Sequence, residues 1–313
     1  MSAILENRMQ SERHAADELA SRVARQTLIR RNEPLAKRTT LRVGGPADIY
    51  VEPASEKDLA AVLGFCSERR MPLLLLGRGS NLLVRDGGFR GAVICLAHPH
   101  FSRIEIAGRN LHCGAGARLK TVAVEAKRHS LAGLEFLEGI PGSVGGALRM
   151  NAGAMGAEMF NVVESVRLMD FDGNILERTR PEMAVEYRSC LTLRTHIALD
   201  AVLKGEPGNR EEIGKRMDAF SRKRWNSQPA SPSAGCIFKN PAAVPAGKLI
   251  DELNLKGVRV GGATVSQEHG NFIINDGAAT ARDVLELIEI IRQRARTERG
   301  IELQTEVQIV GES

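Results

Sequence analysis

The 313-residue sequence has few aromatic residues, no cysteine pairs and no long apolar run. Only 4% of its residues are Phe, Trp or Tyr, which argues against stacking on single-stranded nucleic acid. Its five cysteines are odd in number and form no CxxC pair, which argues against zinc or a disulfide framework and favours a reducing compartment. No stretch approaches the length of a transmembrane helix, and the charged N-terminus does not resemble a signal peptide. We therefore expect a cytoplasmic protein with no metal site and no membrane insertion.

What the sequence does contain is glycine and a moderate positive charge. The 31 glycines favour binding sites lined by backbone. The net charge of +5 suits anionic ligands such as nucleotides or pyrophosphates, although an ordinary solubilising surface explains it equally well. The chain is longer than one hydrophobic core usually serves, so two or three domains are expected.

The first third of the chain has the pattern of a βαβ unit. Residues 47–53 and 72–76 predict strands, and helical spacing of apolar residues between them predicts a helix capped by Ser55. Strands joined in this way are expected to be parallel. Residues 91–96 predict a further strand, and residues 8–26 predict a helix with a thin apolar stripe in a polar, Arg-rich lead.

The middle of the chain predicts antiparallel hairpins. Residues 103–116 predict two short strands that turn at Gly108, and residues 166–178 predict a hairpin that turns at Asp172-Gly173. A helix is expected at about 119–129 and another strand at 195–204.

The last third predicts a charged helix at about 210–224 and a loop at 227–236. Its clearest element is a helix over 281–299 that Thr280 caps. A strand over 304–311 is expected to end the chain. The apolar stripe of the 281–299 helix is predicted to consist of Val284, Leu285, Ile288 and Ile291.

Two glycine-rich loops are candidate ligand sites. The first, Gly77 to Asn81, follows an apolar strand directly, and its N–H groups with Ser80 could hold a pyrophosphate. Leu82 stands where the dinucleotide fingerprint needs a third small residue, so a ligand-free turn is an equal alternative. The second loop, residues 139–156, has six glycines among a few apolar anchors. Two such loops together suggest a large, elongated dinucleotide.

Seven motifs that run in order between about residues 34 and 311 resemble one enzyme family, the UDP-N-acetylenolpyruvoylglucosamine reductases, which are flavoproteins of bacterial peptidoglycan precursor synthesis. The motifs are long and unusual, and only residues 1–33 fall outside them. They are "TTLRVGGPADIYVEP", "GRGSNLLV", "LEFLEGIPGSVGGALRMNAGAMG", "EYRS", "SAGCIFKNP", "AGKLIDELNLKGVRVGGATVSQEHGNF" and "LQTEVQIVG".

The resemblance implies an α+β fold. It combines a bipartite FAD-binding domain of the vanillyl-alcohol-oxidase type with an α+β C-terminal substrate-binding domain. The domains it suggests are an N-terminal extension (1–33), FAD-binding subdomains 1 (34–98) and 2 (99–207), a substrate-binding domain (208–303) and a closing strand (304–313).

The resemblance also implies a reaction. Non-covalent FAD takes hydride from NADPH as co-substrate, and flavin N5 passes it to C3 of UDP-N-acetylglucosamine enolpyruvate. A proton then reaches C2, which gives UDP-N-acetylmuramate. Such chemistry requires a fixed cation near the carboxylate and an acid within reach of C2. The partner is thus a small UDP-sugar enolpyruvyl ether rather than nucleic acid, and we expect a monomer.

Three catalytic residues are implied by the resemblance. Arg188 in "EYRS" matches the family's catalytic arginine, and its guanidinium suits a carboxylate or enolate. Glu306 matches the catalytic glutamate, although alternation along its strand would by itself place it on a solvated face. Cys236 occupies the position of a proton-donating serine.

Cys236 departs from the family pattern. Free cysteine is more often a small core residue, so the residue alone does not indicate catalysis. A thiol with an ordinary pKa of about 8.5 is nevertheless a better acid than an aliphatic hydroxyl and stays mostly protonated near neutrality. We expect the role to survive, with a thiol beside Lys239 that is open to alkylation.

The remaining site residues also come from the resemblance. Ser227 stands where the family often has a substrate-contacting lysine, and no inserted loop with a clamping tyrosine occurs between residues 189 and 204, as in the shorter subclass. We expect cofactor contacts from Gly77, Gly79, Ser80, Asn81, Leu82, Ile140, Pro141, Gly142, Val144, Gly145, Gly146, Asn151 and Gly153. We expect substrate contacts from Tyr187, Arg224, Lys239, Asn240, His269 and Asn271.

Two alternatives stay open. Another flavin oxidoreductase of this fold could oxidise a hydroxy acid or a sugar, but the set Arg188, Cys236 and Glu306 and the lack of a His-linked flavin motif disfavour it. A catalytically inactive nucleotide-binding protein is favoured only by the serine-to-cysteine change. A yellow protein that NADPH bleaches and the enolpyruvyl sugar nucleotide reoxidises would exclude both.

Overall fold

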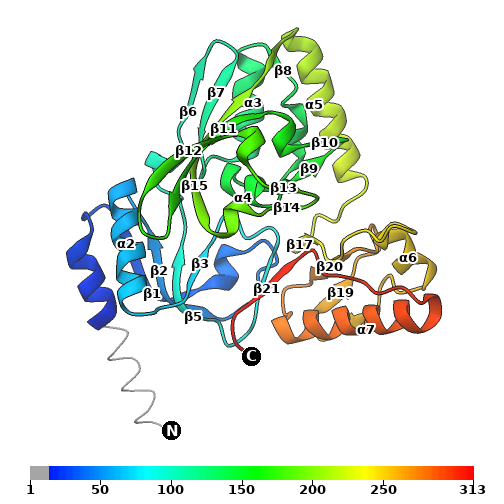
Figure 1. Cartoon of the computed structure of the whole chain (residues 1–313). Helices are drawn as coiled ribbons and strands as arrows, with labels where there is room; N and C mark the ends of the chain where they lie inside the picture. Colours follow the sequence, from blue (N-terminus) through cyan, green and yellow to red (C-terminus); the bar gives the residue numbers. More distant parts are fainter. Residues whose placement is uncertain (1–13) are drawn as a thin grey trace. The chain divides into compact units, whose positions relative to one another are not determined.

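The computed structural model describes residues 14–313, which form two compact units (Figure 1). Unit 1 comprises Asp48–Gly77, Gly91–Arg222 and the described part of Met1–Asn32. Unit 2 comprises Glu33–Ala47, Arg78–Arg90 and Lys223–Ser313.

The two units are not continuous stretches of chain, in contrast to the domains predicted from the sequence. Residues 33–47 and 78–90 group with the C-terminal part of the chain. One physical reason is strand pairing within unit 2, where β4 (Leu82–Val84) runs parallel to β21 (Gln308–Val310). The boundaries of the functional domains stay a prediction.

A four-stranded sheet, most of which belongs to unit 1, has the order β1-β2-β5-β3. Its strands are β1 (Leu28–Pro34), β2 (Pro46–Glu52), β5 (Phe89–Ile94) and β3 (Leu73–Leu75). The predicted strand–helix–strand order is present, with α2 (Glu56–Glu68) between β2 and β3. These two strands are not neighbours, because β5 lies between them and pairs in parallel with β3.

The predicted cap of α2 is confirmed, since the Ser55 side chain accepts a hydrogen bond from Asp58 N. Apolar residues of α2 pack on the sheet, and part of the N-terminal lead joins the same core. Residues 14–22 are helical, and Ala15, Ala16 and Leu19 are buried in this core. The start of the helix predicted over 8–26 lies outside the described residues.

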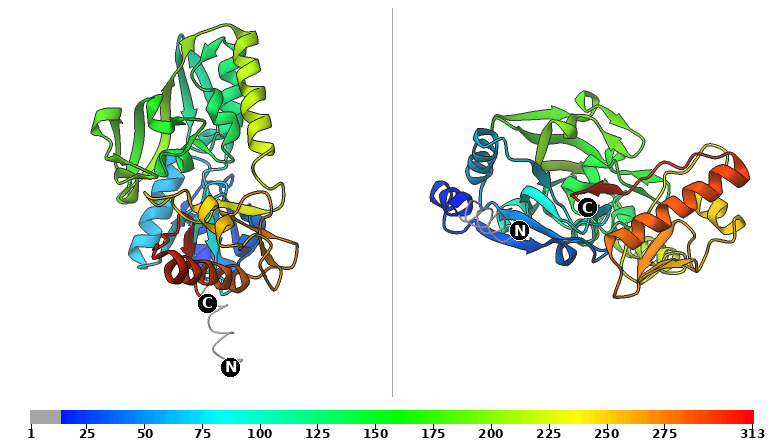
Figure 2. Two further views of the ribbon diagram at one scale, coloured as in Figure 1. Left: turned by 90° about the vertical axis from the view of Figure 1, so that its right-hand side faces the viewer. Right: turned by 90° about the horizontal axis from the view of Figure 1, so that it is seen from below.

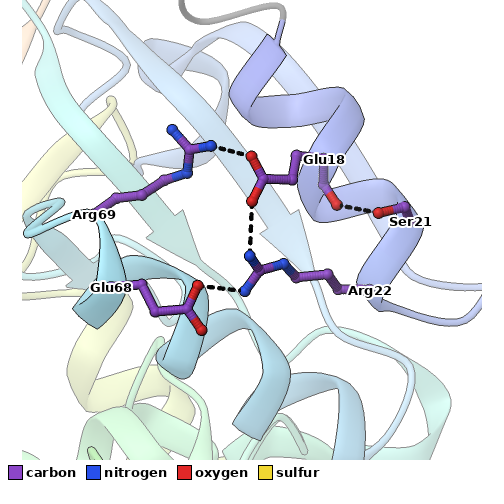
Figure 3. Close-up of polar contacts among 5 residues, drawn as sticks. All are labelled: Glu18, Ser21, Arg22, Glu68 and Arg69. Carbon is purple, nitrogen blue, oxygen red and sulfur yellow. Dashed lines mark hydrogen bonds and ion pairs between the residues drawn. The ribbon is translucent and has the colours of Figure 1, made fainter.

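Charged side chains join the 14–22 helix to α2 (Figure 3). Glu18 accepts hydrogen bonds from Arg22 at 2.7 Å and from Arg69, and Arg22 also pairs with Glu68 at 2.6 Å. The guanidinium groups of Arg22 and Arg69 lie 5.3 and 4.9 Å from the centre of the Phe65 ring. The described part of the lead is therefore packed on unit 1 and covers α2.

The other sheet of unit 1 is antiparallel and has the order β12-β11-β15-β7-β6. Both predicted hairpins are confirmed, because β6 pairs with β7 and β11 pairs with β12. The strands are β6 (Ile104–Ala107), β7 (Asn110–Gly114), β11 (Val163–Asp170), β12 (Ile175–Thr179) and β15 (His196–Lys204).

Helices cover this sheet and enclose the largest core of unit 1. The predicted helices are confirmed as α3 (Leu119–Arg128) and α5 (Arg210–Trp225), and the short α4 (Val144–Arg149) packs on β7 and β15. Short elements complete the unit: η2 (Pro99–Phe101), β8 (Leu131–Ala132), η3 (Glu135–Gly139), β9 (Gly153–Ala154), β10 (Ala157–Glu158), η4 (Met159–Asn161), η5 (Arg180–Glu182), β13 (Val185–Glu186), β14 (Ser189–Cys190), η6 (Thr192–Arg194) and β16 (Glu206–Pro207).

Unit 2 is built on an antiparallel sheet of the order β17-β20-β19-β18, against which α7 packs (Figure 2). The helix α6 (Ala246–Glu252) packs on α7, and η1 (Leu35–Arg38) belongs to the same unit. The sheet strands and the helix are β17 (Ser233–Cys236), β18 (Arg259–Val260), β19 (Ala263–Val265), β20 (Phe272–Asn275) and α7 (Ala281–Arg299).

The helix α7 begins where the sequence predicts it. Thr280 accepts a hydrogen bond from Asp283 N, and Asp283 accepts one in return from Thr280 N. Asp86 adds a cap that the sequence does not reveal, because its carboxylate accepts from Ala281 N at 2.9 Å and Arg282 N at 3.0 Å. The buried stripe includes Leu287, which the predicted stripe omits, while Leu285 is only half-buried.

The predicted C-terminal strand over 304–311 is too long. Only Gln308–Val310 pair as a strand, while Thr305 forms an isolated bridge with Phe238 and the chain bends at Val307. Strand alternation therefore does not extend to Glu306 and gives no information about its face. Among residues 14–313, no helix has both the length and the apolar composition needed to cross a lipid bilayer.

Candidate active site

The first glycine-rich loop follows β3 and adopts a conformation that requires glycine. Gly79 has φ 62°, and a Cβ atom there would lie 2.5 Å from the carbonyl oxygen of Arg38. In unit 1, a Cβ atom on Gly77 would lie 3.0 Å from Ser143 Oγ, a residue of the second glycine-rich loop. Gly77, where the first loop begins, thus lies beside Ser143 of the second loop.

The protein holds the first loop by its carbonyl groups. The Cys95 thiol donates to Gly77 O at 3.9 Å, and Thr40 N donates to Gly79 O at 3.2 Å. Because the N–H of a trans peptide points opposite to its C=O, the N–H groups of Arg78 and Ser80 point away from these partners. Backbone N–H groups such as those of Arg78 and Ser80 are the donors that an anion such as a pyrophosphate requires.

The second glycine-rich loop is packed backbone to backbone. Val144 N donates to Ala117 O at 2.9 Å, and Gly145 N donates to Ala115 O at 2.8 Å. A Cβ atom on Gly145 would lie 3.1 Å from the Cβ of Ala115, so this position is tight. Gly139 differs, because no atom lies within 4 Å of the position a Cβ would take. A ligand contact at Gly139 or Pro141 would therefore use the open side of the loop.

Asn151, at the end of this loop, is 2% exposed and has φ 38°. Its amide nitrogen donates to Glu158 Oε2 at 2.8 Å and to Glu186 O at 3.4 Å, and its oxygen accepts from Phe160 N at 3.2 Å. The side chain thus holds β10 and β13 together. Its contact with a cofactor stays a prediction, as do those of the other loop residues.

Arg188 lies at the turn of the hairpin formed by β13 and β14 in unit 1. It has φ 55°, and its Nη1 donates to Gly153 O at 3.4 Å. The guanidinium also lies 5.6 Å from the centre of the Tyr187 ring, which is 55% exposed. The hairpin therefore presents a cation and an aromatic ring beside the second glycine-rich loop.

Cys236 is the last residue of β17 and is half-buried. Gly235 before it has φ 74°, and the pairing register of β17 with β20 shifts between Ser233 and Cys236. Among the five cysteines only Cys95 and Cys236 are partly exposed. Burial raises the pKa of the Cys66 thiol to about 11, so at least that thiol stays inert near neutrality.

The segment after Cys236 contacts the segment that carries Glu306, and both belong to unit 2. Glu306 N donates to Ile237 O at 2.8 Å, and Lys239 N donates to Gln304 O at 2.9 Å. The Asn81 side chain donates to Glu306 O at 3.1 Å. Two of the three predicted catalytic residues, Cys236 and Glu306, therefore lie on adjacent segments of one unit. The convergence of Arg188 with them stays a prediction, since Arg188 belongs to the other unit.

The predicted substrate residues of unit 2 contact backbone groups. Asn271 is 2% exposed and hydrogen-bonds Phe238, while Asn240 Oδ1 accepts from Ala246 N at 3.0 Å, next to the start of α6. His269 Nδ1 accepts from Asn271 N at 3.1 Å. Burial chiefly, with the charge of Lys256, lowers the pKa of His269, which keeps its ring neutral. Substrate contacts from these residues stay predictions.

Two further positions lie near the end of α5. The guanidinium of Arg224 lies 5.5 Å from the centre of the exposed Trp225 ring. The Ser227 hydroxyl donates to Lys223 O at 2.9 Å, so it helps to end the helix at the position where the family often has lysine. Sequence reasoning missed the supporting residues Thr40 and Cys95, because no local pattern marks a side chain that fastens a distant loop.

The loop geometry fits a dinucleotide, and comparison with known proteins identifies which one. A family described as FAD binding domain matches residues 47–179, which include both glycine-rich loops. The fold and the site therefore define a flavoprotein that binds FAD. A second family, described as the C-terminal domain of UDP-N-acetylenolpyruvoylglucosamine reductase, matches residues 228–310.

Relatives and a solved structure agree with these matches. The UDP-N-acetylenolpyruvoylglucosamine reductase of Clostridioides difficile is 44% identical over 91% of this chain and 94% of its own length. That of Bacillus velezensis is 42% identical over 89% and 93%. The crystal structure of the enzyme from Thermus caldophilus superimposes with a TM-score of 0.79 at 38% identity, over 91% of this chain and 98% of that one. The chain belongs to the UDP-N-acetylenolpyruvoylglucosamine reductase family.

Family membership confirms several expectations from the sequence. The chain is an FAD-dependent oxidoreductase of peptidoglycan precursor synthesis. The predicted α+β fold class, with an FAD-binding domain followed by a separate C-terminal domain, is confirmed by the two family matches and the Thermus structure.

Proposed function

We propose that this enzyme uses NADPH to reduce UDP-N-acetylglucosamine enolpyruvate to UDP-N-acetylmuramate, with Arg188, Cys236 and Glu306 as its catalytic residues. The observation that carries the proposal is the hydrogen bond between Glu306 N and Ile237 O, 2.8 Å long, which holds the Glu306 segment beside Cys236. Relatives named UDP-N-acetylenolpyruvoylglucosamine reductase, at 41–44% identity over about nine-tenths of the chain, support the same substrate.

FAD, when bound, supplies to C3 of the enolpyruvyl ether the hydride that it has received from NADPH. Addition at C3 moves the double-bond electrons towards C2 and its carboxylate. Arg188 stabilises this negative charge, because a fixed guanidinium matches a carboxylate with two hydrogen bonds. The guanidinium is pre-positioned by its hydrogen bond to Gly153 O.

Cys236 gives its thiol proton to C2, which completes the C–H bond and leaves a thiolate. The thiolate then regains a proton from water or through Glu306, so the thiol is restored at each turnover. A half-buried thiol can serve in this way because substrate and water both reach it. Glu306 orients the carboxylate end of the substrate or relays the proton.

The other predicted site residues complete the proposal. The loop from Gly77 to Leu82 would hold the cofactor pyrophosphate, since the N–H groups of Arg78 and Ser80 point away from the protein groups that hold the loop. In this proposal the flavin would be contacted by Ile140, Pro141, Gly142, Val144, Gly145, Gly146, Asn151 and Gly153. Tyr187, Arg224, Lys239, Asn240 and His269 contact the substrate. We propose a cytoplasmic monomer that acts on this small molecule.

Alkylation separates the two halves of the reaction. The purified enzyme is treated with iodoacetamide until peptide mass spectrometry shows Cys236 fully modified, and flavin absorbance is then followed anaerobically. We expect NADPH to bleach the modified enzyme as it does the untreated one, whereas the enolpyruvyl sugar nucleotide fails to reoxidise it. A Cys95→Ser variant treated identically separates the effect of alkylating Cys236 from that of alkylating Cys95.

Full turnover by the Cys236-alkylated enzyme would exclude Cys236 as the acid. A protein that binds FAD but is neither bleached nor reoxidised would instead support an inactive nucleotide-binding protein. Bleaching by a hydroxy acid or a sugar would indicate another flavin oxidoreductase.

A further inference from the structure

The nitrogen and the oxygen of the Asn271 side-chain amide both hydrogen-bond the backbone of one residue, Phe238. Asn271 Nδ2 donates to Phe238 O at 2.8 Å, and Asn271 Oδ1 accepts from Phe238 N at 2.9 Å. The backbone carbonyl of Asn271 also accepts from Ile237 N at 2.9 Å. All of this lies within unit 2, and Asn271 and Phe238 are 2% and 1% exposed.

The Asn271 side chain takes the place of backbone pairing that β17 and β20 do not continue beyond Cys236. Regular pairing of β17 with β20 ends where Cys236 faces Phe272, after a shift of register. Beyond that point the buried N–H and C=O of Phe238 still require partners. An asparagine side chain carries the same donor and acceptor as a peptide group, so Asn271 serves as the pairing partner that the strand lacks.

The Glu306 segment fixes the same stretch through other groups. Glu306 N and Val307 N both donate to Ile237 O, and Lys239 N donates to Gln304 O. Residues 237–239 therefore have hydrogen-bonded partners from two segments, namely Asn271 in the turn before β20 and residues 304–307. Cys236 directly precedes this stretch, so its backbone position depends on both.

We propose that Asn271 is a positioning residue for proton transfer, which holds the Cys236 segment against the Glu306 segment through Phe238. The proposal rests on the proposed function, because it assigns a purpose to the position of Cys236. It differs from the substrate contact that the sequence suggests for Asn271, since both ends of the amide already bind Phe238.

The test compares Asn271→Leu and Asn271→Ser with the same changes at Asn275. Asn275 is a matched control, because it ends β20, which Asn271 directly precedes, is 5% exposed and also uses its amide on backbone groups, donating to Leu41 O at 3.0 Å and accepting from Gly277 N at 2.7 Å. Each holoenzyme is measured for FAD content, for bleaching by NADPH and for reoxidation by the enolpyruvyl sugar nucleotide. Iodoacetamide labelling of Cys236 is measured relative to Cys95 in the same sample.

For the Asn271 variants we expect the reoxidation rate at saturating substrate to fall about 100-fold, as for a misplaced reacting group. The substrate concentration for half-maximal rate and the bleaching by NADPH stay near their wild-type values. Labelling of Cys236 relative to Cys95 rises, because its segment opens more often. The Asn275 variants lose stability but keep the wild-type reoxidation rate and labelling ratio.

Asn271 variants that reoxidise and label like the Asn275 controls would overturn the proposal. A raised half-saturating substrate concentration with an unchanged maximal rate would also overturn it, in favour of a direct substrate contact. If Asn271→Leu does not fold, the test uses Asn271→Ser. The smaller serine leaves space for water to hydrogen-bond the backbone groups of Phe238. Cys236→Ala separates the two hypotheses. If this variant reoxidises at the wild-type rate, Cys236 is not the acid. If it reoxidises slowly while the Asn271 variants reoxidise normally, only the role of Asn271 is contradicted.

Discussion

Arg188 has a backbone conformation that arginine seldom adopts. Its φ of 55° lies in the left-handed region, which costs a non-glycine residue about 1–2 kcal/mol. Glycine would relieve that cost at the tip of the β13–β14 hairpin, yet the chain has an arginine there. The side chain contacts Gly153 O and the face of Tyr187. We infer that the guanidinium is kept for function and not for stability.

Arg188→Lys is expected to slow substrate reduction about 100-fold or more, because lysine cannot make the paired hydrogen bonds that stabilise charge on a carboxylate. The rate of flavin reoxidation by the enolpyruvyl sugar nucleotide, measured at saturation, checks this. Bleaching by NADPH serves as the internal reference and should change little. Arg180→Lys, on the exposed η5 of the same unit, is the matched control. Equal reoxidation rates for the two variants would remove Arg188 from the mechanism.

At the scale of elements, the sequence predicts those helix ends and hairpin turns that depend on residues close together in the chain. The helix α7 begins at Thr280 as expected, and the hairpin at Gly108 forms, because caps and turns depend on neighbours in sequence. The strand predicted over 304–311 does not include Glu306. Its neighbour Thr305 instead forms a bridge with Phe238, 67 residues earlier in the chain. No periodicity records such a pairing.

Asparagine side chains recur in the segments that carry the predicted catalytic residues. Asn81 donates to Glu306 O, and Asn151 donates to Glu186 O, two residues before Arg188. The resemblance to the reductase family implies that both contact the cofactor. Their hydrogen bonds show that they also fix backbone within their own units.

Asp58 offers a test of how the N-terminal lead is attached to α2. Its buried carboxylate accepts from Ala24 N at 2.9 Å and from the hydroxyls of Thr27 and Ser55 at 3.0 Å each. Burial by itself would raise the pKa of Asp58, but these hydrogen bonds outweigh it and hold the pKa below its ordinary value. We expect Asp58→Ala to lower the free energy of unfolding by about 2 kcal/mol at pH 7, because it orphans these donors.

The same contribution should depend on pH. Since the pKa is lower in the folded than in the unfolded protein, the stabilisation is complete above the unfolded pKa of about 3.9 and is lost as pH falls through the folded pKa. Urea unfolding at several pH values checks both effects, with Asp172→Ala in an exposed turn as the control. A stability difference that persists unchanged well below pH 3.9 would contradict this account.

At the scale of the whole molecule, the chain passes between two compact units several times. Residues 33–47 and 78–90 leave the N-terminal part of the sequence to join unit 2. The predicted cofactor residues of the first glycine-rich loop are divided between the two units, with Gly77 in unit 1 and Gly79 to Leu82 in unit 2. FAD, as a ligand of the folded chain, should stabilise it against unfolding.

Removal of FAD is expected to lower the midpoint of thermal unfolding. A ligand that binds only the folded state at 100 times its dissociation constant stabilises it by about 2.7 kcal/mol. Scanning calorimetry of the apoenzyme with increasing FAD checks this, and ADP should restore part of the shift if the loop from Gly77 to Leu82 holds the pyrophosphate. Coincident unfolding curves for the apoenzyme and the holoenzyme would contradict FAD binding by these loops.

The sequence by itself determined the class of this protein. Glycine loops, caps, hairpin turns and seven ordered motifs depend on residue identity at short range, and they led to an FAD-dependent reductase whose family the comparisons confirm. Only the tertiary structure decided which distant segments meet: β4 with β21, Asp86 with the start of α7, and the Cys236 segment with that of Glu306. The strand pairing and the Cys236–Glu306 contact depend on backbone hydrogen bonds, which residues of almost any type can make, and the carboxylate of Asp86 caps a helix that begins 195 residues later. No local pattern in the sequence therefore reveals these contacts.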